Sequence, residues 1–136
     1  MNTGRLFLSA LGGWVAYFAF GGVVFGALPV LRNEFAKYPA IYRTQESMRP
    51  VMPFGMAAMF VAILVMAAIF AMTLRGGSGF APGARFGALI GVFVVCAFVI
   101  HNHVNLNIGF SLTAAQAIAY FIEWTLVGAV IGLLYR

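Results

Sequence analysis

Residues 101–124, HNHVNLNIGFSLTAAQAIAYFIEW, decide how the rest of the chain is interpreted. Most of the sequence is apolar, but this stretch combines both histidines with several amide side chains and one embedded acid, Glu123. It predicts a helix that ends at Asn105, a short turn, and a second helix that begins near residue 112. We expect any chemistry of the protein to lie in this helix–turn–helix.

The composition around this stretch is that of a membrane protein. Of the 136 residues, 63% are hydrophobic and 8% are charged, whereas soluble domains have roughly 45–50% apolar and about 25% charged residues. The mean hydropathy is +0.99. The sequence therefore predicts a single all-α, multi-pass domain over residues 1–136, and we expect it in a bacterial inner membrane.

Four apolar segments are long enough to cross a hydrocarbon core of about 30 Å. We predict helices over residues 5–29, 51–74, 82–105 and 112–135, packed in a compact four-helix bundle. The third apolar run, residues 86–100, covers only roughly 22 Å at 1.5 Å per residue, so its helix must extend to Asn105.

The polar segment 30–50, between the first two predicted helices, is rich in basic and aromatic residues. Such residues suit the headgroup layer, so we interpret this segment as an interfacial connector. The alternative is a lid over a pore or a site.

Glycines recur every four residues in three of the predicted helices, a pattern that lets membrane helices approach closely. They are Gly22 and Gly26, then Gly83, Gly87 and Gly91, then Gly128 and Gly132. The pattern predicts a tight bundle or an oligomer. On a helical wheel, Asn102 and Asn105 continue the stripe of the third helix and are expected to face a neighbouring helix. If Asn105 lies level with Thr113, His101 lies level with residue 117.

Glu123 lies near the middle of the fourth predicted helix, and hence near the bilayer midplane. An ionisable side chain at this depth is costly and is a functional-site hypothesis by default. Desolvation favours the neutral acid. Gln116 shares the helical face of Glu123, and Tyr120 flanks this face. Tyr17 is the predicted hydrogen-bond partner of Glu123, with Trp14 as the alternative. The alternative to a functional role is a structural one, in which a protonated Glu123 forms a hydrogen bond with another helix or a second subunit.

His101 and His103 are two residues apart and point in roughly opposite directions on a helix, so they cannot chelate one metal ion. We predict no metal site and no cofactor. Together with Asn102 and Asn105, the histidines are expected to donate hydrogen bonds or exchange protons at the mouth of a cavity. The alternative is that these four residues close the turn between two helices.

Several other functions are excluded or disfavoured by the sequence. There is no serine–histidine–acid arrangement, phosphate-binding glycine loop or pair of catalytic carboxylates, so we predict no enzymatic activity. One face of the second predicted helix carries Met52, Met56, Met59 and Met66. Thioether side chains can bind copper(I), but methionine also fills gaps between packed helices. We predict that these four residues pack between helices and bind no copper.

The basic residues are spread over loops and ends, which indicates contact with anionic lipid rather than nucleic acid. The eight Lys and Arg residues are divided equally between the two sides, so they define no orientation.

In length, helix number and scarcity of polar residues, the chain resembles small multidrug exporters and fluoride channels. The resemblance implies a four-helix membrane architecture. Small multidrug exporters carry their essential glutamate in the first helix, whereas this first helix has no acid. The asparagine, phenylalanine and threonine motifs of fluoride channels are also missing, so no functional residue is carried over.

Two functions remain open from the sequence. The first is transport or conduction of a small solute or ion by an oligomer, with Glu123 as the proton or cation site. The route to this site would run from the 30–50 side past His101, Asn102, Asn105 and Gln116. The second is a non-catalytic subunit or assembly factor of a larger membrane complex, whose glycine faces dock partner helices.

Overall fold

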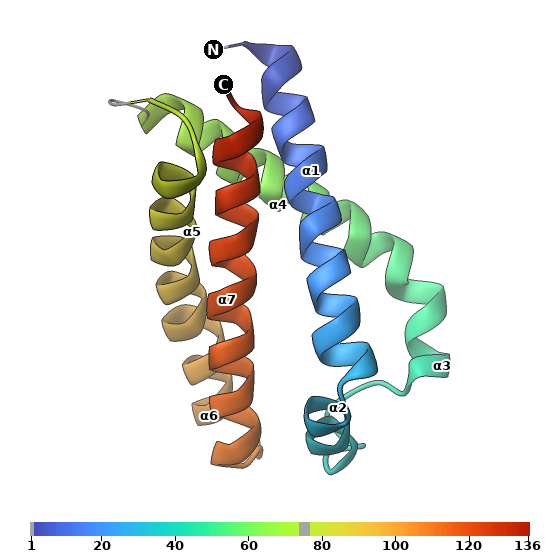
Figure 1. Cartoon of the computed structure of the whole chain (residues 1–136). Helices are drawn as coiled ribbons and strands as arrows, with labels where there is room; N and C mark the ends of the chain where they lie inside the picture. Colours follow the sequence, from blue (N-terminus) through green and yellow to red (C-terminus); the bar gives the residue numbers. More distant parts are fainter. Residues whose placement is uncertain (1, 74–76) are drawn as a thin grey trace.

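The computed structural model of the chain describes residues 2–73 and 77–136. All regular structure in these residues is helical, which confirms the predicted all-α class (Figure 1). Four continuous helical spans are long and apolar enough to cross a membrane: Thr3–Ala27, Gln45–Thr73, Phe80–Asn105 and Phe110–Leu134. They indicate a multi-pass membrane protein.

The first span consists of α1 (Thr3–Gly21) and a π-helical segment, η1 (Gly22–Ala27). The Asn2 side chain caps its start by accepting a hydrogen bond from the Arg5 amide at 3.1 Å. The span ends at Ala27, two residues before the predicted boundary. Pro29 then begins α2 (Pro29–Ala36), because the first helical turn tolerates a residue without an amide hydrogen.

The second span begins earlier than its predicted start at residue 51. It consists of α3 (Gln45–Met48), a 3₁₀ turn, η2 (Arg49–Val51), and α4 (Met52–Thr73). Thr44 caps α3, with its hydroxyl oxygen accepting a hydrogen bond from the Ser47 amide at 3.3 Å. The predicted last residue, Leu74, lies outside the described residues.

The third span consists of α5 (Phe80–Val94), a π-helical segment, η3 (Val95–Ile100), and α6 (His101–Asn105). It extends to Asn105, as its length predicts. A π-helical segment holds more residues per turn than an α-helix and rotates the faces of all residues that follow it. As a result Val99 is buried and Asn105 is exposed, so the prediction that Asn105 faces a neighbouring helix is wrong.

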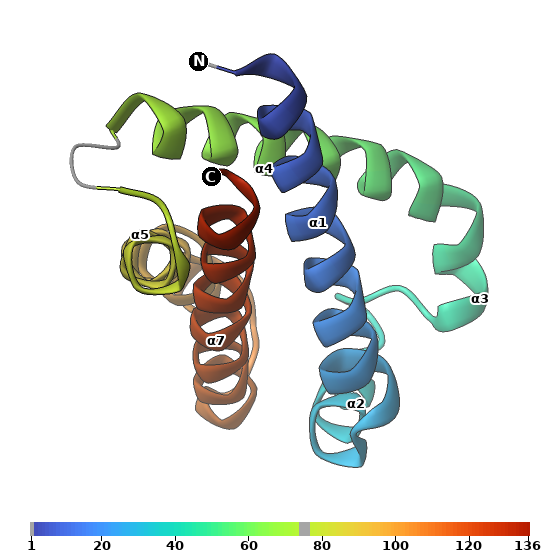
Figure 2. The ribbon, with the colours of Figure 1, turned by 45° about the horizontal axis from the view of Figure 1, so that its top comes forward.

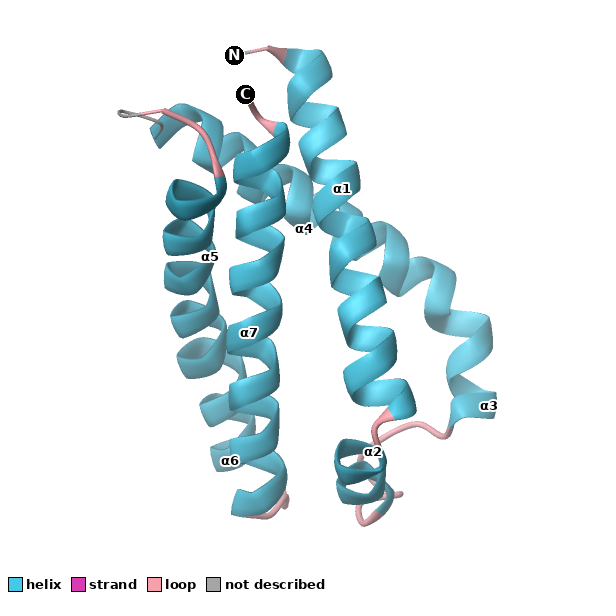
Figure 3. Ribbon diagram, viewed as in Figure 1, coloured by secondary structure: helices cyan, strands magenta, loops and turns pink. Residues whose placement is uncertain are grey.

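The fourth span, α7 (Phe110–Leu134), lies between α5 and α1 and packs against both (Figure 1). α4 contacts α1 and α7 as well, but it crosses them obliquely, which Figure 2 shows most clearly. The two termini lie at the same end of the molecule. Figure 3 shows that α2 lies at the opposite end, followed by the loop that leads to α3.

α5 and α7 meet backbone to backbone at glycines. A Cβ atom added to Gly83 would lie 2.3 Å from the carbonyl oxygen of Gly128, and one added to Gly87 would lie 2.9 Å from the Gly128 Cα. Only glycine permits this approach. A Cβ atom on Gly22 or Gly26 would meet nothing within 4 Å, so these two glycines contact no neighbour within the described chain.

Two apolar clusters fill the interior. The cluster at the terminal end joins α1, α4 and α7, and consists of Leu6, Ala10, Ile63, Met66, Ala67, Phe70, Trp124, Val127 and Ile131. The cluster at the other end joins α2 to the start of α7, and consists of Leu31, Ile108, Leu112 and Ala119. Glu123 follows Ala119 by one helical turn and precedes Trp124, so it lies between the two clusters.

Candidate functional site

Glu123 is a buried carboxyl without a hydrogen-bond partner. The residue is 1% exposed. Both carboxyl oxygens are inaccessible, and neither forms a hydrogen bond within residues 2–73 and 77–136. Buried polar groups in folded proteins are almost always paired, and an unpaired one costs about 1–3 kcal/mol. Such a group therefore requires a functional or structural explanation.

The carboxyl of Glu123 lies against the backbone of α1. A Cβ atom added to Gly21 would lie 2.9 Å from the Glu123 Oε1 atom, so the carboxyl group would have to shift to admit a methyl group there. Glycine at this position therefore makes room for the acid. Gly21 is the last residue of α1, where the helix widens into the π-helical η1 segment.

Neither of the predicted partners binds Glu123, so this prediction is wrong. The Trp14 indole Nε1 instead donates a hydrogen bond to the backbone oxygen of Met56 in α4, at 2.9 Å. The Tyr17 ring packs against the ring of Trp124, with 5.5 Å between centroids. Both side chains come from the expected depth of the first span. Trp14 is directed toward α4, whereas Tyr17 lies one helical turn before Gly21 on the same face of α1 and still forms no hydrogen bond with Glu123.

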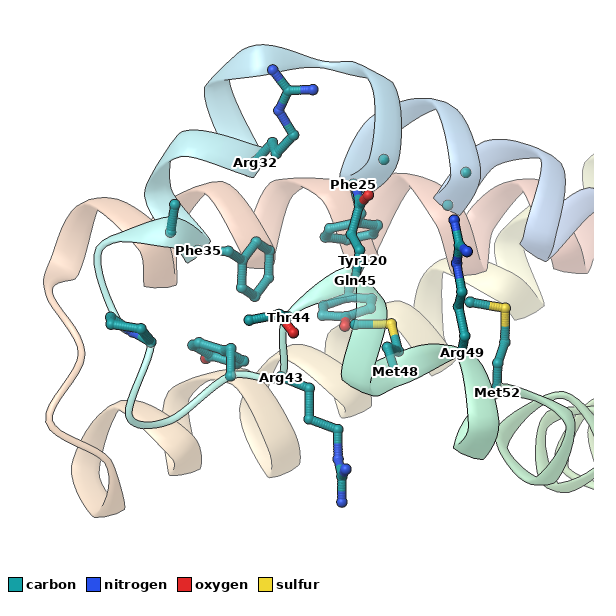
Figure 4. Close-up of a pocket in the computed structure, with 16 residues that line it drawn as sticks. Phe25, Arg32, Phe35, Arg43, Thr44, Gln45, Met48, Arg49, Met52 and Tyr120 are labelled. Atoms are coloured by element: carbon teal, nitrogen blue, oxygen red, sulfur yellow. The ribbon is translucent and has the colours of Figure 1, made fainter.

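A cavity of about 750 Å³ lies beside Gly21. One wall is the end of the first span, where Gly21, Gly22 and Gly26 line the open space. The opposite wall is formed by residues 32–45 and the start of the second span, and α7 contributes Tyr120 (Figure 4). The buried Glu123 carboxyl and the cavity therefore meet at the same glycine.

Four aromatic rings form a continuous row along this cavity. Phe25 lies 5.2 Å from Tyr120 and 6.1 Å from Phe35, and Phe35 lies 4.7 Å from Tyr42, measured between ring centroids. All four residues line the cavity. The row links η1, α2, the following loop and α7, so it brings together segments that are distant in sequence.

The predicted histidine and asparagine residues lie at the turn between α6 and α7. His103 Nδ1 lies 2.9 Å from the Thr113 hydroxyl oxygen. The side chain that meets Thr113 is therefore that of His103, and not that of Asn105, as the assumed alignment of the two helices has it. His101 and Asn105 are exposed, and Asn102 is partly buried.

Glu123 is distant from this turn. Ten residues separate it from Thr113, or roughly 15 Å along the helix axis. The structure therefore brings Glu123 together with Tyr120 and the cavity, and not with the histidines. Gln116 is buried on α7 between the two levels.

The sequence interpretation missed the cavity and its basic residues. Arg32, Arg43 and Arg49 line it, whereas the sequence predicts an interfacial connector, or a lid over a pore or a site, for their segment and singles out none of the three. The available signal was the glycine repeat near the end of the first helix, which was interpreted as a packing face. Across residues 2–73 and 77–136, no group of three or more His, Cys, Asp or Glu side chains is placed to hold a metal ion.

No protein-family model, curated protein or solved structure matches the chain.

Proposed function

We propose that the protein transports or conducts a small solute or ion across a membrane, and that Glu123 binds and releases a proton in this process. One observation supports the proposal above all others. Glu123 is an unpaired, buried carboxyl that lies against Gly21, and Gly21 also lines an open cavity. Ionisable groups inside membrane spans mark proton and ion pathways by default.

The surroundings of Glu123 suit proton exchange from one side only. Toward the cavity, the α1 wall carries no side chain at Gly21 or Gly22, so a small displacement of η1 would admit water to the carboxyl. Toward the termini, Trp124, Val127 and other residues of the terminal cluster close the path. Transport then requires a second conformation in which this cluster opens and the cavity side closes.

Infrared difference spectroscopy of the protein in lipid tests whether Glu123 is in contact with water. The carbonyl band of the acid is identified by its loss in Glu123→Gln. We expect this band to shift on transfer to heavy water and to disappear at alkaline pH. In vesicles, we expect the wild type to dissipate an imposed pH gradient and Glu123→Gln to lose this activity. Glu46→Gln removes an exposed acid and is the matched control.

A stability measurement accompanies this test. Glu123→Met replaces the unpaired carboxyl with an apolar side chain of similar length, and we expect it to stabilise the fold by about 1–3 kcal/mol. Unfolding in mixed micelles measures this difference. Stabilisation together with loss of proton exchange indicates an acid retained for function. A band that neither exchanges nor titrates, with unchanged flux in Glu123→Gln, would contradict the proposal.

A non-catalytic subunit or a homo-oligomer is the second candidate. One observation favours it: a Cβ atom on Gly22 or Gly26 would meet nothing within 4 Å in the part of the chain that the structure describes, although glycines at this spacing commonly contact a second helix. A helix of a partner or of a second copy would then fill the cavity and give Glu123 its missing hydrogen bond. This candidate predicts a dry Glu123 and a cysteine cross-link between Gly22→Cys and the partner helix.

A further inference from the structure

We infer that the cavity is a binding site for an amphipathic anion, a molecule with an apolar body and a carboxylate or phosphate head. The inference rests on the proposed function, because it names the class of molecule that enters the same cavity. Its test measures binding alone and does not depend on the behaviour of Glu123.

The cavity has room for such a molecule because of its glycine wall. Cβ atoms on Gly22 and Gly26 would meet nothing within 4 Å, so no side chain of the described chain covers this part of the first span. A volume of about 750 Å³ lies within the range of roughly 300–1,000 Å³ that small-molecule sites occupy.

The body of the ligand is expected to be apolar. Apart from the glycines, most of the uncharged lining is apolar or aromatic: the aromatic row of Phe25, Phe35, Tyr42 and Tyr120, together with Met48 and Met52; Thr44 and Gln45 are the uncharged polar residues. Aromatic and thioether side chains contact acyl chains and rings without requiring directional polar groups.

The head of the ligand is expected to be negatively charged. Three arginines line the cavity, and no acidic residue does. Arg49 extends from the start of the second span beside Met52, whereas the Arg32 and Arg43 side chains point away from the other labelled lining residues, so Arg49 is the arginine placed to contact the head (Figure 4). Within the described residues none of these arginines forms a salt bridge. Of the two acids in the connecting segment, Glu34 is paired with Lys37, and Glu46 is exposed and forms no salt bridge with Arg49.

This distribution of charge discriminates between classes of ligand. Guanidinium groups bind carboxylates and phosphates through paired hydrogen bonds, and they repel cations. A neutral apolar molecule would use the aromatic row but would gain nothing from Arg49. Arginines that contact only bilayer headgroups do not need an adjacent cavity. A variant that fills the cavity should therefore weaken ligand binding only if the cavity is the binding site.

The test uses the full-length protein in a neutral detergent, with radiolabelled oleate as the probe. Unlabelled competitors carry the same chain on different heads: oleate, oleoyl lysophosphatidic acid, neutral monooleoylglycerol and cationic oleylamine. We expect both anions to displace the label and the neutral and cationic molecules to be much weaker. The stronger of the two anions shows whether the source of the ligand is a free fatty acid or a phospholipid head.

Two pairs of variants locate the binding. Gly26→Leu fills the cavity, and Gly55→Leu is its control, because a Cβ atom at either position meets nothing within 4 Å and Gly55 does not line the cavity. Arg49→Gln removes one head contact, and Arg5→Gln is its control outside the cavity. We expect Gly26→Leu and Arg49→Gln to weaken oleate binding on the order of tenfold, and the controls to bind normally.

The results separate this inference from the proposed function. Equal binding by Gly26→Leu and Gly55→Leu, or competition by monooleoylglycerol as strong as by oleate, would overturn the inference. Proton exchange at Glu123 could still be intact in that case. If the wild type binds oleate as expected while proton exchange at Glu123 is absent, only the proposed function fails.

Discussion

Individual glycines in this chain have opposite structural roles. Gly83, Gly87 and Gly128 allow two backbones to touch, and any side chain there would collide with main-chain atoms. Gly21 instead accommodates the Glu123 carboxyl, and Gly26 borders open space. The same residue type at the same four-residue spacing thus serves helix contact in one place and a cavity wall in another.

Gly128→Ala tests the backbone contact between α5 and α7. Its Cβ atom would lie 2.5 Å from both the Gly83 oxygen and the Gly87 Cα, and backbone atoms cannot give way as a flexible side chain can. We expect a loss of about 1–3 kcal/mol in unfolding free energy, as for other overpacked interiors. Unfolding in mixed micelles measures it.

The matched control for this substitution is Gly55→Ala, which adds the same methyl group in open space on α4. It should leave the unfolding free energy unchanged or raise it slightly, because alanine is the better helix former. Equal stability of the two variants would show that α5 and α7 can separate at no cost.

At the level of helices, the segment between the first two spans is held against the α6–α7 turn. The Gly109 amide donates a hydrogen bond to the Tyr38 hydroxyl at 2.8 Å, and Leu31 of α2 is buried against the start of α7. These contacts position α2 and the loop after it as one wall of the cavity. The sequence left open whether residues 30–50 form a connector or a lid, and residues of this segment line the cavity, which suits either interpretation.

Tyr38→Phe removes the acceptor for the Gly109 amide and retains the ring. We expect a loss of about 1 kcal/mol in stability and faster amide exchange at Gly109, because one partly buried hydrogen bond disappears. Hydrogen–deuterium exchange measured by mass spectrometry checks this. Tyr42→Phe is the control from the same segment, since no hydrogen bond of its hydroxyl occurs among the described residues, and it should exchange like the wild type.

In the whole molecule, α7 is the centre around which the other helices are arranged. It packs against α5 on one side and α1 on another, and it carries Glu123 between the two apolar clusters. The oblique path of α4 separates its first turns from α1, and the cavity lies in the space between the two spans (Figures 2 and 4).

If all four spans cross the membrane, the two termini lie on one side of it and α2 on the other. Single cysteines in a Cys96→Ala background, labelled with an impermeant thiol reagent, test this arrangement. Ser78→Cys and Arg136→Cys should react from one side, and Arg43→Cys from the opposite side. Reaction of Ser78→Cys and Arg136→Cys from opposite sides would contradict the four spans. Reaction of every cysteine from both sides would show that the chain inserts in two orientations.

Local properties of the sequence sufficed to predict the helical class and the four apolar spans. Each depends on the length and polarity of one segment, measured against the thickness of a bilayer. The same reasoning predicted that the third helix continues to Asn105, because a shorter helix cannot cross.

The tertiary structure alone decided which face of each helix is inside, and hence the partner of every polar residue. A helix in lipid is apolar all round, so hydrophobic periodicity does not distinguish its buried face. Phe54 is 82% exposed and Ile63 is 0% exposed on the same helix. The π-helical segment in the third span then rotated Asn105 outward. The cavity arose from residues of three separate spans and the connecting segment, which no single stretch of sequence contains.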